Sequence, residues 1–381
     1  MNQPKKISTR QLIIFFCIYF FSIKFLSLPQ ILSTEAAQDA WVVALLGTVL
    51  EICILFLVLN IVLSNQKQDI APNKSLLSHI ARCSVLVLML FVFVLQLIII
   101  MRLSHTLLND NLFDSMSDHL FVIPLLFFGV LFCFVPGRAI FRSGEVFYLL
   151  IFIGLALSVL PAITQMNFNE LTPVLGTGAG SIFRGLYHNL IYFESASFIL
   201  IFGQDIKTTK NFRKKFMTTA IILGVVFVLF ILMFTAVFGP LAETKSTAIA
   251  DLTLYSKFLT RGGRMDWILI CIWLLLLLVR FGATFFAAFV AIKYIFKVEK
   301  RAGYIGFMLA GVLYVLYAWA FTSRTVFDNF LHDISPLITA LYFVIPLAFF
   351  IGMIIRKKNA GKKQLPNSNK STKNKRRRSN V

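Results

Sequence analysis

Long apolar runs separated by short polar segments dominate the sequence, and each run is close to the length that a helix needs to cross a bilayer. A bilayer core requires about 20 apolar residues in an α-helix. Runs of this kind cover roughly residues 11 to 33, 40 to 63, 82 to 108, 120 to 136, 144 to 163, 182 to 203, 216 to 239, 266 to 293, 303 to 322 and 336 to 355. The pattern predicts an all-α polytopic membrane protein with about ten transmembrane helices in one domain, residues 1–355.

Polar residues interrupt the first of these runs. Ser22, Lys24, Ser27 and Pro29 lie close together in its middle and outer half. A lysine at the bilayer centre costs about 2.5 to 3.5 kcal/mol on insertion scales, so it usually faces a protein interior. Pro29 removes a backbone donor and moves Leu28 away from helical angles. We expect two half-helices joined by irregular backbone that binds a ligand. The alternative is a kinked helix whose lysine snorkels to an interface.

The sixth run contains the same kind of anomaly. Its polar side chains are denser than a lipid-facing helix tolerates, and Glu194 lies near mid-bilayer. One irregular span in each half of a five-plus-five chain is typical of a transporter binding site. We therefore predict inverted repeats over about 11–163 and 182–355 whose breaks meet at the midplane. The candidate ligand-binding residues are Ser22, Lys24 and Ser27 in the first run and Tyr187, His188, Glu194 and Ser195 in the sixth.

Further charged residues lie inside other predicted spans. Glu51, in the second span, competes with Glu194 as the partner of Lys24. Arg280 lies at a central depth of the eighth span, which favours a place in the bundle interior. Arg102 lies about two turns from the end of the third span, so it either faces the interior or reaches the interface. The histidines show no metal-ligand spacing, and we expect no metal.

Composition and charge distribution agree with this membrane assignment. Hydrophobic residues make up 58% of the chain and charged residues 14%. The formal net charge of +20 could indicate nucleic acid, but the lysines and arginines lie in short loops and a tail. They precede the first span and follow the even-numbered spans, whereas the other loops are richer in acidic residues. This asymmetry predicts cytoplasmic termini. The five cysteines have no paired metal spacing, so we expect free thiols.

Two loops on the expected outer side are longer than simple connections. Residues 167–181 are rich in glycine but lack the lysine and the preceding strand of a phosphate-binding loop. Residues 242–264 carry apolar residues among polar ones in a pattern suited to an amphipathic helix lying over the outer surface, where it acts as a gate or as a strut. We find no catalytic motif and expect neither an enzyme nor a cofactor.

The C-terminal segment, residues 356–381, is basic and has no acidic residue. Its asparagine, serine and glycine content gives it no core, so we expect a disordered cytoplasmic tail. Each lysine or arginine near an anionic leaflet contributes about 1 kcal/mol. We expect contact with anionic lipid in preference to nucleic acid, because the tail starts at the end of the tenth span and has no aromatic residue for base stacking.

Short motifs spread over nearly the whole chain follow the order and spacing of a known family. They are residues 7–11, Leu28-Pro29, residues 36–41, Arg102, Gly137-Arg138, residues 171–175, Gly178, Phe193-Glu194 and the basic run 207–215. With these motifs the chain resembles the membrane-embedded B subunit of endospore nutrient germinant receptors, a branch of the amino acid-polyamine-organocation superfamily. The resemblance implies a leucine-transporter-like inverted-repeat fold in the spore inner membrane. It also implies a subunit that senses a small nutrient, chiefly an amino acid, with A and C partner subunits.

One feature departs from that family. The family commonly has Gly-X-Gly at the first break, whereas this chain has Ser22-Ile23-Lys24. Either Lys24 supplies the contact to an anionic ligand or it is neutralised internally and the ligand differs, and sodium dependence is not expected. A proton-linked or uncoupled transporter and a passive scaffold for other subunits remain the alternatives to a sensor. Sensing and transport both need a midplane pocket and two states that a ligand distinguishes.

Overall fold

The computed structural model describes residues 7–347, except for 68–75, 114–116, 203–205, 208, 210, 256–265, 297, 299–301, 323, 335, 342 and 345. Most of this part of the chain is helical, and Ile7 and Ile206 form one isolated parallel bridge. The predicted all-α class is therefore confirmed. The basic tail, residues 356–381, and the end of the tenth predicted span lie outside the described residues.

The helices follow one another with few long connections. They are α1 (Thr9–Leu26), α2 (Leu28–Ala36), η1 (Ala37–Asp39), α3 (Ala40–Lys67), α4 (Leu76–Asn111), α5 (Asp118–Phe134), α6 (Gly137–Val159), η2 (Leu160–Gln165), η3 (Phe168–Leu171), α7 (Gly178–His188), η4 (Leu190–Phe193), α8 (Ser197–Phe202), α9 (Phe212–Phe238), η5 (Gly239–Thr244), α10 (Ala248–Tyr255), α12 (Asp266–Phe296), α13 (Ala302–Thr322) and α14 (Arg324–Asp333). Residues 336–341 are also helical.

Six stretches of the described chain are long and apolar enough to cross a membrane. They are Thr9–Leu26, Leu28–Leu63, Cys83–Asn111, Gly137–Gln165, Phe212–Thr244 and Trp267–Phe296, and shorter apolar helices cover His119–Phe134, Leu190–Phe202 and Gly303–Trp319. These stretches coincide with the first nine predicted spans. The chain is thus a multi-pass membrane protein.

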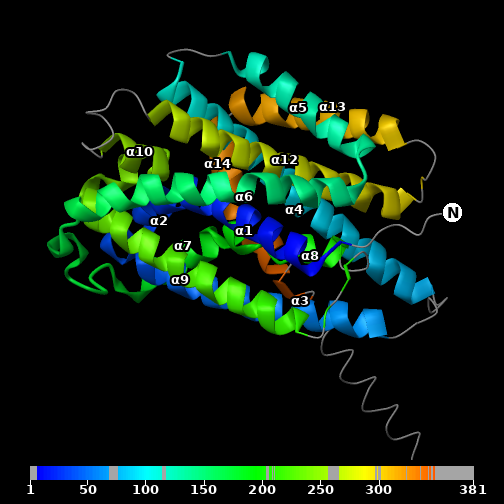
Figure 1. Cartoon of the computed structure of the whole chain (residues 1–381), viewed down its shortest axis with the longest axis horizontal. Helices are drawn as coiled ribbons and strands as arrows, with labels where there is room; N and C mark the ends of the chain where they lie inside the picture. The colour runs from blue at the N-terminus through cyan, green and yellow to red at the C-terminus, as the bar shows by residue number, and fades with distance from the viewer. Residues whose placement is uncertain are drawn as a thin grey trace, which may run out of the picture.

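Helices that lie far apart in the sequence pack against each other in pairs. The most extensive packing joins α3 to α9, α4 to α12 and α5 to α13. In Figure 1, α3 and α9 lie along one side of the molecule and α5 and α13 along the opposite side, with α1, α4, α6 and α12 between them. Each of these pairs joins spans that are five apart, as two symmetry-related halves would. The inverted repeats over 11–163 and 182–355 stay a prediction.

Small residues allow the helices of one such pair to approach closely. A Cβ atom added to Gly224 in α9 would lie 2.4 Å from Cγ2 of Thr48 in α3. On the same α3 helix, a Cβ atom on Gly47 would lie 2.3 Å from Cζ of Phe193. Close helix approach at glycine is the usual way in which membrane helices associate. Both α9 and the region after α7 are therefore held tightly against α3.

The first predicted span is interrupted at a single residue. Ser27 separates α1 from α2, yet its φ of −115° and ψ of −28° remain right-handed helical. Its N–H donates to the carbonyl of Ile23 at 3.1 Å. Pro29 lies in the first turn of α2, where a missing N–H removes no helical hydrogen bond. The prediction of a break is confirmed, but the prediction of an irregular segment is wrong, because the proline is accommodated at a new helix start.

The sixth predicted span is interrupted over a longer stretch. Between α7 and α8 the chain passes through Asn189, the short 3-10 helix η4 and residues 194–196. Asn189 and Glu194 have backbone angles outside the main helical region, with ψ of 13° at each. The Asn189 side chain donates to the carbonyl of Gly185 at 2.9 Å and so covers one acceptor at the end of α7. The sixth span therefore contains the irregular backbone that the sequence predicts for both the first and the sixth span.

A buried carboxylate organises one of the two long loops. Asp39 accepts hydrogen bonds from the backbone N–H of Leu175 at 2.7 Å and of Thr177 at 3.0 Å. It also accepts from the Thr177 hydroxyl at 2.7 Å. Two stretches that carry the family resemblance, 36–41 and 171–178, are thus bonded to each other. Of the amphipathic helix expected over 242–264, the structure shows η5 and α10, and residues 256–265 lie outside the described part.

Candidate functional site

Lys24 forms a buried ion pair with Glu51. The lysine lies in the last turn of α1, where the helix dipole favours a cation, and its Nζ bonds Oε2 of Glu51 in α3. Nζ also lies 3.7 Å from the centre of the Phe20 ring. Lys24 is 1% exposed, so it does not snorkel to an interface. Of the two candidate partners that the sequence left open, the structure selects Glu51 and not Glu194.

Glu194 instead pairs with Arg280. Its Oε1 lies 3.4 Å from Nη2 of Arg280 in α12 and accepts a hydrogen bond from the Tyr19 hydroxyl at 3.0 Å. Glu194 is 1% exposed and Arg280 is 2% exposed. The predicted interior place of Arg280 is therefore confirmed. The arrangement brings the sixth span to the first through Tyr19, a residue that the sequence patterns did not single out.

Further hydrogen bonds join the Glu194–Arg280 pair to the first, third and sixth spans. Arg280 donates to the Tyr19 carbonyl, to Oγ of Ser22 at 3.0 Å and to Oε1 of Gln96 at 3.0 Å. Gln96, in α4, donates in turn to the carbonyl of Ile191 at 2.7 Å. The inner network consists of Tyr19, Ser22, Lys24, Glu51, Gln96, Glu194, Ser195 and Arg280, each at most 2% exposed.

The sixth-span break also reaches the first ion pair. The backbone N–H of Ser195 donates to Oε1 of Glu51 at 3.2 Å, so Glu51 contacts both broken spans. Two cations and two carboxylates are buried together, and their formal charges cancel. A buried charge without a partner would cost several kcal/mol, whereas matched pairs with additional hydrogen bonds are tolerated. The network is electrically balanced, so a ligand with a net charge would leave an uncompensated charge unless it replaced one of its members.

Three buried polar atoms on the helices that carry the network have no hydrogen-bond partner among the described residues. They are Oγ1 of Thr48, Nε1 of Trp273 and Nε of Arg280. Thr48 lies one turn before Glu51 on α3, and Trp273 lies two turns before Arg280 on α12. Buried polar atoms in native proteins nearly always have a partner, so each unpaired one requires an explanation. A bound polar molecule would supply partners for these atoms.

The other predicted ligand-binding residues lie elsewhere. Ser27 bonds the carbonyl of Ile23 within its own span, at 3.4 Å. Tyr187 is 44% exposed at the end of α7, and His188 follows it. Arg102 differs from the other intramembrane charges because its side chain in α4 is only partly buried. The structure therefore brings together Ser22, Lys24, Glu194 and Ser195, but not Ser27, Tyr187 and His188.

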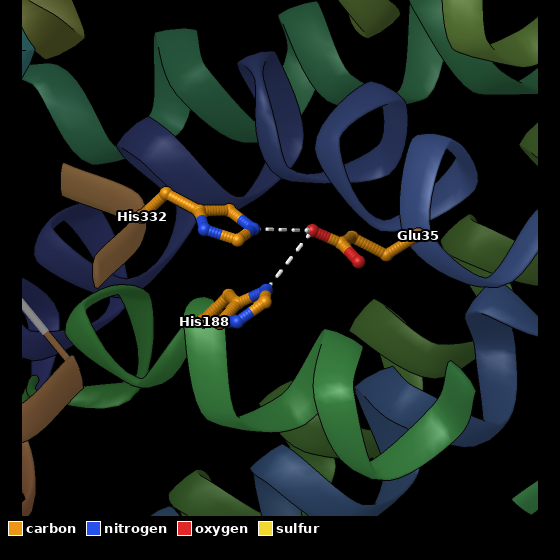
Figure 2. A group of neighbouring side chains, drawn as sticks. All are labelled: Glu35, His188 and His332. Atoms are coloured by element: carbon orange, nitrogen blue, oxygen red, sulfur yellow. Dashed lines mark hydrogen bonds and ion pairs between the residues drawn. The ribbon is translucent and has the colours of Figure 1, made fainter. Parts of the chain in front are cut away.

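His188 belongs to a second group of polar side chains, the Glu-His-His cluster. It consists of Glu35 in α2, His188 in α7 and His332 in α14. Figure 2 shows both imidazole rings directed at the same carboxylate oxygen. That oxygen, Oε1 of Glu35, lies 3.2 Å from Nδ1 of His188 and 3.4 Å from Nε2 of His332. The first and sixth broken spans thus contribute residues to both the inner network and this cluster.

Two comparisons with known proteins agree with each other. Residues 6–326 match a family model described as spore germination protein. The chain is also similar to spore germination protein YndE of Bacillus subtilis (strain 168). The two sequences are 24% identical over 340 residues, which cover 86% of this chain and 90% of the relative.

Proposed function

This chain belongs to the spore germination protein family, and we propose on that premise that it is the nutrient-sensing subunit of a germination receptor. In this proposal it lies in the spore inner membrane with both termini in the cytoplasm. It binds a small nutrient, such as an amino acid, between the first and sixth spans. It then triggers germination together with A and C partner subunits.

The observation that carries the proposal is the inner network at the junction of both broken spans. Lys24, Glu51, Glu194 and Arg280 are all buried there. Intramembrane charges are costly and usually mark a site. A purely structural core would serve as well with apolar side chains, because replacing buried ion pairs by apolar residues is often neutral or stabilising. The unpaired atoms of Thr48, Trp273 and Arg280 add donors that a ligand would use.

The pairing of Lys24 with Glu51 bears on the ligand. It supports internal neutralisation of Lys24, one of the two possibilities that the departure from Gly-X-Gly leaves open. The carboxylate of an amino acid would have to replace Glu51 at Lys24 or bind another donor, such as Nε of Arg280. A neutral nutrient would leave both ion pairs intact. A nutrient panel should therefore include sugars and nucleosides beside amino acids.

The depth of the network implies a conformational step. Its residues are at most 2% exposed, so a ligand reaches them only when the spans separate. A ligand that binds one arrangement of the spans better than the other shifts the population between them. In a receptor this shift would be transmitted to partner subunits. A proton-linked or uncoupled transporter, the alternative function, would instead release the ligand on the other side.

The basic tail is assigned a supporting role in this proposal. Residues 356–381 would lie on the anionic cytoplasmic leaflet. A synthetic peptide of this segment should bind anionic vesicles, fail to bind neutral ones and be released as salt rises. Equal binding to both kinds of vesicle, or none to either, contradicts the lipid contact.

Germination of spores that lack this chain tests the main proposal. Spores complemented with the wild-type chain should respond to one nutrient of the panel, and spores with Lys24→Met or Glu194→Gln should lose or shift that response. Lys214→Met, an exposed lysine on α9, is the matched control. Immunoblots of spore membranes show whether each variant is present. An unchanged dose response in both network variants contradicts the assigned site, and no response of the wild type to any nutrient contradicts sensing.

Vesicle uptake separates sensing from transport. The active nutrient is offered to vesicles that contain the purified wild-type chain, with and without a proton gradient. A sensor binds the nutrient without accumulating it. Saturable accumulation that Glu194→Gln abolishes would favour the transporter instead.

A further inference from the structure

We propose that the Glu-His-His cluster binds one divalent transition-metal ion, with Zn²⁺ as the best match. Glu35, His188 and His332 come from α2, α7 and α14, and one ligand atom of each lies within 4.8 Å of the other two. The inference is independent of the proposed nutrient site, because none of these residues belongs to the inner network. It assigns a role to His188, which the sequence pattern placed in the ligand pocket.

The two distances from the Glu35 carboxylate to the histidine nitrogens match those between ligands of a single ion. Zinc binds histidine nitrogen at about 2.0 to 2.1 Å and carboxylate oxygen at about 2.0 to 2.2 Å. Two ligands of a tetrahedral ion are therefore roughly 3.3 Å apart. Oε1 of Glu35 lies 3.2 Å from Nδ1 of His188 and 3.4 Å from Nε2 of His332. The ring centres of His188 and His332 lie 3.5 Å apart, so the two rings have to rotate away from each other before both nitrogens bind one ion.

The environment of His332 resembles that of a metal-bound histidine. Its Nδ1 lies 3.0 Å from Oδ1 of Asp333. An ionised carboxylate only accepts, so Nδ1 of His332 donates to Asp333, and Nε2 is the ring atom that faces Glu35. Metal-bound histidines regularly donate their other ring N–H to a carboxylate, as His332 does to Asp333.

A glycine in α7 allows α7 and α2 to approach each other closely beside the cluster. Gly185 lies one turn before His188, and a Cβ atom there would lie 3.2 Å from Cβ of Glu35. The glycine thus lets α7 approach α2 closely enough for His188 to reach the carboxylate. The side chains of Glu35 and His188 are 20% and 14% exposed, and that of His332 is 48% exposed. The site is reachable from solvent, and water would supply the fourth ligand of a zinc ion.

The donor set selects the class of metal. Two imidazoles and one carboxylate suit zinc and other late transition metals, whereas magnesium and calcium prefer oxygen ligands. The sequence shows no metal spacing because the ligands come from segments far apart in the chain; Glu35 and His188 alone are separated by 153 positions. A bound ion would link α14 to α2 in the first broken span and to α7 in the sixth. It would thereby oppose movement of α2 and α7 away from α14.

Metal titration of the purified full-length chain in detergent tests the site. In competition with a chromogenic chelator, the wild-type chain should bind one Zn²⁺ ion. Co²⁺ should give visible d–d bands without a thiolate charge-transfer band, which separates this site from the cysteines. His188→Ala and His332→Ala should each weaken binding at least tenfold. His119→Ala, a histidine bonded to Tyr314 and remote from the cluster in sequence, is the matched control and should bind as the wild type does.

The outcomes distinguish the site from adventitious binding. Binding weaker than the chelator detects, or binding that His332→Ala leaves unchanged, overturns the proposal. His332 is partly exposed, so its alanine variant keeps the test valid even where His188→Ala disturbs folding. Zn²⁺ should also raise the thermal midpoint of the wild type and of His119→Ala in a concentration-dependent way, but not that of His332→Ala. Neither readout depends on germination, so the metal site and the nutrient site can fail separately.

Discussion

The inner network and the Glu-His-His cluster are made from the same two broken spans but differ in their access to water. The first span contributes Lys24 to the network and Glu35 to the cluster, and the sixth contributes Glu194 and His188 respectively. The side chains of the two ion pairs in the network are at most 3% exposed, whereas the side chains of the Glu-His-His cluster are 14% to 48% exposed. One pair of breaks thus places charges in two different electrostatic environments.

This difference in exposure suits the two groups of residues to different roles. Charges in the dry interior interact strongly and have to be balanced at all times, so the network strongly favours one arrangement of the spans. The partly exposed cluster loses less solvation on binding and remains open to ions from solution. The network is therefore suited to distinguish conformations, and the cluster is suited to modulate them through an added ion.

The largest expected effect comes from removing one charge of a buried pair. Glu51→Leu leaves Lys24 buried without its carboxylate and should destabilise the chain by about 3 to 5 kcal/mol. The double variant Lys24→Met/Glu51→Leu removes both charges and should recover most of that loss. Denaturant unfolding of the purified proteins in detergent measures both, with Lys214→Met as the exposed control. A loss below about 1 kcal/mol for Glu51→Leu would mean that the pair is not buried as described.

The second prediction concerns which charges are coupled. A double-mutant cycle on Glu194 and Arg280 should give a coupling free energy of about 1 to 3 kcal/mol. A cycle on Lys24 and Glu194 should give a smaller value, because Glu51 is the direct partner of Lys24. The charge swap Lys24→Glu/Glu51→Lys should accordingly restore assembled protein better than Lys24→Glu/Glu194→Lys. The reverse order would assign Lys24 to Glu194.

The part of the fold that could be predicted from the sequence is the part that follows from the lengths of the apolar runs. Nine predicted spans coincide with apolar helices because a bilayer imposes that length. The character of the first break was not predictable, since the effect of Pro29 depends on where the second helix starts. At the start of α2 the proline costs little, and the interruption shrinks to Ser27.

The inner network was predictable from its charges but not from its connections. Lys24, Glu194 and Arg280 stand out as ions within apolar runs. Tyr19 and Gln96 did not, although a lone glutamine inside the long apolar run of α4 is a detectable signal. The choice of Glu51 as the partner of Lys24 depends on how α3 packs between the broken spans. The Glu-His-His cluster needs three distant segments to meet, which no local spacing reveals.

The third prediction compares the two glycines that position these groups. Gly47→Ala should destabilise by about 1 to 3 kcal/mol, because its Cβ would meet the buried Phe193 ring beside Glu194 at 2.3 Å. Gly185→Ala should cost less, since its closest contact is Cβ of Glu35 at 3.2 Å. Thermal unfolding checks the order. We also expect Gly47→Ala to alter the nutrient response and Gly185→Ala to weaken zinc binding, so equal effects of both variants on both readouts would contradict two separate groups.

The smallest expected effect on the unfolding free energy is that of replacing His332 when no metal is present. His332 is about half exposed, so truncation to alanine removes little buried surface and only weak, solvent-screened contacts. Without metal, His332→Ala should therefore stay within about 0.5 kcal/mol of the wild type in unfolding free energy. With Zn²⁺ at 100 times its dissociation constant, the wild type should gain about 2.7 kcal/mol and the variant should not. A large loss without metal would instead place His332 with the network residues, as a side chain on which the fold depends.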